Sequence, residues 1–198
     1  MNKLFLTGLM AAAFLVACEN KKPDSEHQAE NQNEEKMKDS TTTVMDKADE
    51  EFAVKLAGAG MEEIELGKLA EEKGQLKEVK EFGKHMVHQH TQVGEELKEL
   101  AKRKNITLPD SLSADAKAKK EELMKLKGRE FDQKYMAAMV DGHKMVLSEV
   151  EKEATDAKDA DLKAFAEKTA PVIKEHLKMA ETTDSLAKAE NKGKKKMM

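Results

Sequence analysis

Lys84-His85-Met86-Val87-His88-Gln89-His90 lies in the middle of a long amphipathic pattern and carries three of the chain's six histidines. Apolar residues around it recur every three or four positions, which predicts a helix with one apolar stripe. The stripe consists of Leu76, Val79, Phe82, Met86, Val93, Leu97 and Leu100. His90 falls near the centre of this stripe, whereas His85 and His88 fall on the polar side or at its border. Because a buried imidazole needs polar partners, His90 directs attention to the polar residues of the other helices.

Three further helical patterns of similar length accompany this one. The four helices are expected at about 49–73, 75–104, 131 to a turn near 157, and 159–188. Pro171 falls on the outer face of the last helix and is expected to bend it without interrupting its stripe. Each helix places one ionisable side chain among its inward apolar residues. These side chains are Glu63, His90, His143 and His176.

The segment from 105 to 128 decides whether these four side chains meet. It contains a charged helical pattern at about 113–127, with Ser113 as a plausible N-cap. If the segment runs back along the bundle, the four side chains fall within roughly 10 Å of height, and if it turns back at once the spread roughly doubles. A long crossover of this kind connects the helices of ferritin-like bundles. The sequence therefore predicts an all-α, ferritin-like four-helix bundle with a long helical crossover between its second and third helices.

The N-terminus has the features of an export signal. A charged start is followed by an apolar run that is too short to remain as a membrane-spanning helix, which predicts a signal peptide at 1–17. Leu15-Val16-Ala17-Cys18 resembles the lipobox of bacterial lipoproteins, in which the cysteine is lipidated and becomes the new N-terminus. We therefore expect a lipid anchor on Cys18, a disordered tether at 18–48, a helical bundle at 49–188 and a basic tail at 189–198. The expected location is the bacterial cell envelope, at the outer membrane and facing the periplasm.

Composition excludes several classes of function. The chain has 198 residues, of which 39% are hydrophobic and 37% charged, with a net charge of -4. Such a small net charge of mixed sign argues against a nucleic-acid partner. Cys18 is the single cysteine and is assigned to the anchor, so the bundle has no thiol for a disulfide or a nucleophile. No nucleophile elbow or phosphate-binding loop is present in the sequence, and the outer helix faces identify no protein partner. These observations favour a non-enzymatic role and leave the question of catalysis open.

Several separated motifs resemble one bacterial family. They occur in the expected order and cover most of the chain from about residue 49 to 186. The motifs are Gly60-Met61-Glu62-Glu63-Ile64-Glu65-Leu66-Gly67, Val79-Lys80-Glu81-Phe82-Gly83, Met86-Val87-His88-Gln89-His90, Phe131-Asp132-Gln133-Lys134-Tyr135, Leu162-Lys163-Ala164-Phe165-Ala166 and Pro171-Val172-Ile173-Lys174-Glu175-His176. They resemble the "domain of unknown function 4142" family. The resemblance implies a ferritin-like bundle, usually exported and often lipid-anchored, with no settled biochemical activity. The family pattern usually has an aspartate just before the second-helix histidine, where this chain has Gln89.

Two interpretations of the inward polar residues remain. In the first, they form a structural hydrogen-bond network in a non-enzymatic, possibly stress-related envelope module. In the alternative, Glu63, His90, His143 and His176 bind a transition metal such as Zn, Cu or Fe. The Glu-x-x-His pairs of di-iron bundles are missing, because Val87, Val140 and Ile173 precede the histidines by three residues. Asp132 and Gln89 are candidates for residues that orient an imidazole, although Asp132 is three turns before His143 and is expected nearer the end of the bundle.

Overall fold

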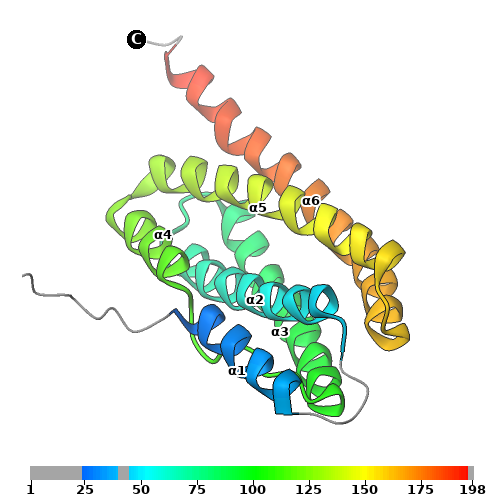
Figure 1. The fold of residues 1–198 in the computed structure, drawn as a ribbon. Helices are drawn as coiled ribbons and strands as arrows, with labels where there is room; N and C mark the ends of the chain where they lie inside the picture. Colours follow the sequence, from blue (N-terminus) through cyan, green and yellow to red (C-terminus); the bar gives the residue numbers. More distant parts are fainter. Residues whose placement is uncertain (1–23, 40–44, 196–198) are drawn as a thin grey trace, which may run out of the picture.

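The computed structural model describes residues 24–39 and 45–195 of the chain. Within these ranges the chain forms six helices and no strand, which confirms the all-α prediction. The helices are α1 (Ser25–Asp39), α2 (Lys47–Lys73), α3 (Lys77–Lys104), α4 (Ala114–Lys125), α5 (Gly128–Asp156) and α6 (Ala160–Lys195). The pairs α2–α3 and α5–α6 form two antiparallel hairpins, which pack together through α3 against α6 and α2 against α5 (Figure 1). This arrangement is compatible with the expected four-helix bundle, and its ferritin-like character stays a prediction.

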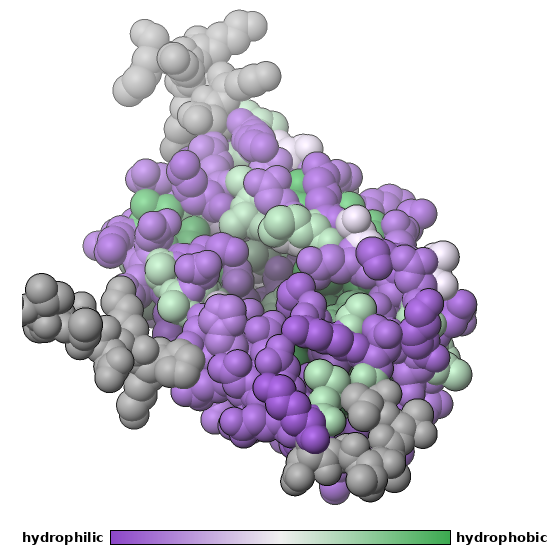
Figure 2. Space-filling view, viewed as in Figure 1, coloured by the Kyte–Doolittle hydropathy of each residue, from purple (hydrophilic) through white to green (hydrophobic). Residues whose placement is uncertain are grey.

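The apolar stripes of the four long helices form two separate clusters. One cluster includes Leu66, Phe82 and Tyr135, and the other includes Leu97 and Val150. Burying a large apolar side chain contributes about 1.5 to 3 kcal/mol, so the two clusters supply the main driving force for assembly. The outer faces are charged, and Figure 2 shows mostly hydrophilic residues over the visible surface with hydrophobic ones in small areas.

The first hairpin depends on a close approach of two glycines. A Cβ atom added to Gly67 would lie 2.8 Å from the carbonyl oxygen of Gly83, and one added to Gly83 would lie 2.7 Å from the carbonyl oxygen of Gly67. Real Cβ atoms do not come this close to a backbone oxygen. The hairpin therefore tolerates no side chain at either position without moving α2 away from α3.

The crossover between α3 and α5 runs along the length of α2. Ile106, just after α3, packs in the same cluster as the N-terminal part of α2. Further on, Lys119 in α4 pairs with Glu62 at 2.6 Å, and Lys73 at the end of α2 donates a hydrogen bond to the carbonyl oxygen of Met124. The contacts thus move steadily along α2, as the sequence predicted. They bring the start of α5 level with the α2–α3 turn.

A buried carboxylate on α5 closes the α2–α3 turn. Asp132 is only 1% exposed, and its two oxygens accept hydrogen bonds from the backbone N–H groups of Gln75 and Leu76, each at 2.9 Å. These groups precede the first turn of α3, where helix geometry provides no backbone acceptor for them. Asp132 therefore acts as an N-terminal cap supplied by another helix.

The turn of the second hairpin is bound in the same manner, by a carboxylate from the first hairpin. Asp49 on α2 is 2% exposed and accepts hydrogen bonds from the backbone N–H groups of Lys158 and Asp159 in the α5–α6 turn. Asp49 and Asp132 are 83 positions apart, and so are the turn residues Gln75 and Lys158 that they bind. The two hairpins are thus related by an approximate internal repeat, and each supplies a carboxylate that binds the turn of the other.

The expectation of a disordered tether at 18–48 is wrong over residues 25–39, which form α1 beside α2 (Figure 1). The prediction rested on the scarcity of apolar residues, and α1 is indeed strongly polar. The signal peptide at 1–17 and the anchor residue Cys18 lie outside the described residues, as do 19–23 and 40–44, so those predictions stand as made.

Polar side chains attach α1 to the segment that follows α3. The side chain of Asn33 is buried, donates to the carbonyl oxygen of Thr107 at 3.0 Å and accepts from the backbone N–H of Thr107 at 2.7 Å. Lys36 donates to the carbonyl oxygen of Asn105 and to the hydroxyl of Thr107. Ala29 is fully buried. Because α1 has few apolar residues, it is held in place mainly by hydrogen bonds from its side chains to the segment after α3.

The C-terminal helix is longer than expected. The tail was predicted to begin at 189, whereas α6 continues to Lys195 and extends beyond the rest of the bundle (Figure 1). The helix also passes Pro171 without interruption, as predicted. None of the helices in the described ranges combines the length and the apolar character that crossing a membrane requires.

Candidate metal centre

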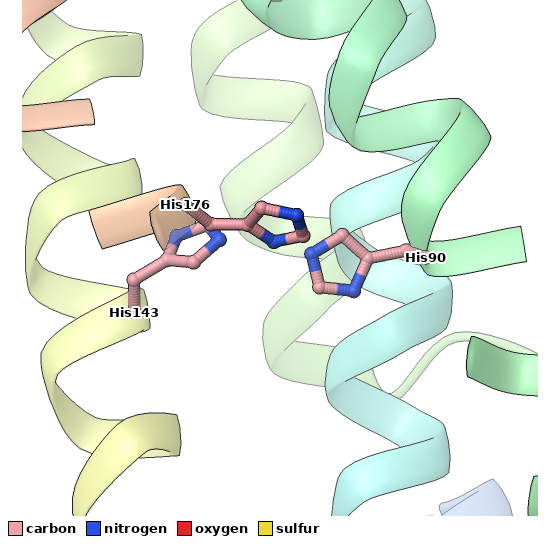
Figure 3. A group of neighbouring side chains, drawn as sticks. All are labelled: His90, His143 and His176. Carbon is pink, nitrogen blue, oxygen red and sulfur yellow. The ribbon is translucent and has the colours of Figure 1, made fainter. Parts of the chain in front are cut away.

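Three of the four predicted side chains meet between the two apolar clusters. His90 comes from α3, His143 from α5 and His176 from α6, and their rings point toward one another (Figure 3). The ring centroids are 5.7 Å apart for His90 and His143, 5.1 Å for His90 and His176, and 5.6 Å for His143 and His176. One nitrogen from each ring lies within 4.8 Å of the other two. We refer to these three residues as the three-histidine cluster.

Burial keeps the three imidazoles neutral. Their exposed fractions are 6% for His90, 2% for His143 and 1% for His176. Burial lowers the pKa of His176 to about 3, with smaller contributions from His143 and His85. Burial also lowers the pKa of His90 and that of His143. Neutral imidazole is the form that ligates metal ions, so the cluster is in its ligating form at neutral pH.

The hydrogen bonding of His143 fixes which of its nitrogens is free. Its Nδ1 lies 2.8 Å from the carbonyl oxygen of Met139, one turn earlier on α5. A carbonyl oxygen can only accept, so Nδ1 carries the proton and Nε2 keeps its lone pair. This Nε2 is buried and has no hydrogen-bond partner among the described residues.

His90 and His176 also contain unsatisfied nitrogens. The Nε2 atom of His90 and the Nδ1 atom of His176 are buried without a hydrogen-bond partner in the described part of the chain. Leaving a buried polar group unpaired costs about 1 to 3 kcal/mol. Three such nitrogens on three converging rings are not the pattern of a satisfied structural network. One nitrogen from each ring is placed so that the three could hold a metal ion.

Glu63 lies beside the cluster but is not one of its three converging members. Its Oε1 atom is 3.7 Å from Nδ1 of His143, and its Oε2 atom is buried without a hydrogen-bond partner among the described residues. Burial raises the pKa of Glu63 to about 8, and the nearby Glu62 adds to the shift. The carboxyl group therefore lies on the Nδ1 side of His143, while the hydrogen bond of Nδ1 to the carbonyl oxygen of Met139 fixes the orientation of the ring.

Asp132 and Gln89, which the sequence predicted to orient an imidazole, form no hydrogen bond to any of the three histidines within the described ranges. The carboxylate of Asp132 is committed to the backbone of the α2–α3 turn, so its proposed role beside an imidazole is replaced by a capping role. Gln89 is half-buried next to His90 in sequence, and it makes no side-chain hydrogen bond within the described ranges. Glu63 instead occupies the position beside an imidazole.

The helical periodicity did not predict that His85 contacts the cluster. His85, at the border of the α3 stripe, is half-buried, and its ring lies 5.6 Å from that of His176 at an interplanar angle of 84°. The stripe of α3 alone could not reveal this contact, because α6 packs over its edge. His88 is exposed, as expected, and makes no ring contact in the described part of the chain.

The three-histidine cluster fits a transition-metal ion with a modest adjustment. Three nitrogens bound at about 2.1 Å in tetrahedral geometry are about 3.4 Å apart. The nitrogens of His90, His143 and His176 lie within 4.8 Å of one another, so small side-chain rotations would close the set. Three histidines with a free fourth position are a known ligand set for zinc, and imidazole also suits copper, iron and nickel.

A groove between α2 and α3 reaches the cluster. Its volume is about 790 Å³, and His90 and Ile173 contribute to its wall. Gly60 and Gly94 also line it, and apart from their chain neighbours and the adjoining backbone of their own helices, no heavy atom of the described residues lies within 4 Å of where their Cβ atoms would be. Most of the other lining residues are apolar. The volume is within the range of small-molecule pockets.

Comparison with known proteins identifies a family and nothing finer. No curated protein and no solved structure matches the chain. A family model described as "Domain of unknown function (DUF4142)" matches residues 25–183, a range that begins at the first residue of α1 and includes every member of the three-histidine cluster. The chain therefore belongs to the DUF4142 family, a family of unknown function.

Proposed function

We propose that this protein binds a divalent transition-metal ion through His90, His143 and His176. The observation that carries the proposal is the convergence of three buried imidazole nitrogens that have no hydrogen-bond partner in the described structure. A metal ion would satisfy all three at once. A purely structural network, the first interpretation of the sequence, would instead be expected to pair these atoms with one another or with Glu63.

The ligand chemistry favours zinc, copper or another ion of similar preference. Neutral nitrogen donors suit these ions, whereas magnesium and calcium require mostly oxygen ligands. The hydrogen bond from Nδ1 of His143 to the carbonyl oxygen of Met139 would orient this ring toward the ion, an arrangement common around metal-bound histidine, and Glu63 would lie beside the centre with its Oε1 atom 3.7 Å from the same nitrogen. An oxygen-activating di-iron centre is not supported, because the carboxylate set of that class is missing from the cluster.

The test is metal titration of the full chain carrying Cys18→Ala, so that no lipid is attached. Titration with Co²⁺ followed by absorption, and with Zn²⁺ followed by calorimetry, should show one ion per chain. His143→Ala and His176→Ala should each weaken binding at least about tenfold, since each removes one of three ligands. His88→Ala is the matched control, because this histidine is exposed on α3 and should leave binding unchanged.

Stability measurements separate the metal centre from the structural network. If the cluster binds metal, an excess of ion at 100 times the dissociation constant should stabilise the wild-type fold by about 2.7 kcal/mol and the His143→Ala variant much less. If the cluster is only structural, the variants would lose stability while added metal has no effect on any of them. That result, or equal affinity in all variants, would refute the proposal.

We also propose that the protein is a lipoprotein of the cell envelope, anchored through Cys18 at the outer membrane and facing the periplasm. The support is the sequence of the first 18 residues, with its charged start, short apolar run and cysteine after small residues. Cys18→Ala should abolish labelling by a radioactive fatty acid and release the protein from membranes. Continued acylation of this variant would refute the anchor without affecting the metal centre.

A further inference from the structure

His85 differs from the three-histidine cluster in its exposure. It precedes His90 by five residues on α3, so the two rings leave the helix at about 140° to each other and approach His176 from different sides. The ring of His85 contacts only His176 among the described aromatic and histidine rings, whereas the ring of His176 contacts all of His85, His90 and His143. His85 is half-buried, and the other three are buried.

A buried centre needs a path by which an ion arrives. With His90, His143 and His176 between 1% and 6% exposed, a hydrated ion cannot bind all three nitrogens from solution in one step. It must lose its water molecules progressively and exchange them for protein ligands. A partly exposed imidazole that touches one of the final ligands provides the first such exchange.

The groove that reaches His90 is a less suitable path for an ion. Its lining includes the carboxylates of Glu95, Glu99 and Asp110, but none of these is a nitrogen donor, and His90 is its one histidine. Most of the other lining residues, such as Leu56, Val93 and Leu97, offer no lone pairs to replace water. Moving a charged ion along an apolar wall is unfavourable because the ion loses hydration without gaining ligands. The side of the cluster that carries His85 offers a nitrogen ligand at each step.

We propose that His85 and His176 form an outer site that captures a divalent transition-metal ion from solution and passes it to His90 and His143. The proposal rests on the metal centre proposed above. His176 would hold the ion throughout, because it is the ring that all the others contact. The bond to His85 and the remaining bonds to water would be exchanged for bonds to His90 and His143, with no change in the oxidation state of the ion.

The experiment measures the rate of loading and the affinity separately. The full chain carrying Cys18→Ala is mixed rapidly with Co²⁺, and the absorption of the bound ion is followed in time. His85→Ala should slow loading about tenfold and slow release in a chelator by a similar factor. Its equilibrium affinity should stay close to that of the wild type, because an intermediate site affects both directions equally. His88→Ala, one turn away on the same helix, should load at the wild-type rate.

The outcomes distinguish the outer site from its alternatives. If His85→Ala weakens affinity as much as His176→Ala does, His85 is a ligand of the final centre and the outer site is wrong. If His85→Ala loads normally, the outer site is also wrong, and slow loading of Gly94→Leu would then identify the groove as the path. Failure of the wild type to bind Co²⁺, Zn²⁺, Cu²⁺ or Ni²⁺ would refute the metal centre itself. Circular dichroism of each variant verifies that it is folded.

Discussion

Replacing Asp132 by alanine should remove the cap that α5 supplies to α3. The carboxylate is 1% exposed and accepts two backbone hydrogen bonds of 2.9 Å, from Gln75 and Leu76. Hydrogen bonds to a charged group contribute about 1.5 to 3 kcal/mol each, and partial access of water to the turn reduces the sum. We expect the free energy of unfolding to fall by about 3 kcal/mol. At about 2 to 4 °C per kcal/mol for a chain of this length, the melting temperature should fall by roughly 6 to 12 °C.

Urea unfolding followed by far-ultraviolet circular dichroism measures this loss. Asp141→Ala is the matched control, since Asp141 lies on the same helix, is exposed and has no hydrogen bond or ion pair in the described structure. Asp132→Asn keeps one acceptor and should be intermediate. Metal affinity should be unchanged in Asp132→Ala, because the cap is remote from the three-histidine cluster. A loss no larger than that of Asp141→Ala, or a large loss of metal affinity, would refute the capping role.

Two further predictions concern stability. Burial, and to a smaller extent the negative charge of Asp49, raises the pKa of Glu153 to about 7. The carboxyl group of Glu153 therefore keeps its proton up to about pH 7 in the folded chain, whereas it loses the proton near pH 4.5 in the unfolded chain. Stability should therefore decline as pH rises from about 4.5 to 7, and Glu153→Gln should raise the free energy of unfolding at pH 8 by about 1 to 2 kcal/mol, after allowance for screening, with no change at pH 4. Equal stability of the two proteins at pH 8 would contradict this. Gly83→Ala should destabilise the fold by about 2 to 3 kcal/mol because its Cβ would meet the backbone of α2. Gly94→Ala, in the same helix but in open space, should stabilise it by up to about 1 kcal/mol, and similar effects of the two substitutions in thermal unfolding would contradict the close approach.

The long helices could be predicted because their information is local. Their apolar stripes repeat with the helical period, and Gly74 and Pro109 mark the ends of the first two helices and the start of the crossover. The predicted bounds agree with the structure to within a few residues, apart from the C-terminal extension of α6. Helix rise alone then indicated that a crossover along the bundle would bring Glu63 level with the histidines.

Residues whose partners lie on another element were harder to predict. Asn33 holds α1 by bonding to a backbone more than 70 positions away, and no property of its own helix signals this contact. The sequence predicts that Asp132 orients an imidazole, whereas its actual role as an acceptor depends on the register between α5 and the α2–α3 turn. His85 was assigned to the edge of α3, and only the packing of α6 reveals that this edge is covered.

The exchange of caps between the hairpins has a consequence for how the chain folds. Each turn receives its acceptor from the other hairpin, and Asp49 binds backbone groups 109 and 110 positions further along the chain. The side chain of Asp159 caps the first turn of α6 from within its own hairpin, but the N–H groups of each turn find their acceptor only on the other hairpin. Formation of the caps must therefore wait for contacts between distant parts of the chain, which slows folding relative to a bundle stabilised only by neighbours in sequence. The same dependence makes unfolding cooperative, because loss of either hairpin leaves the backbone N–H groups of the other hairpin's turn without their acceptor.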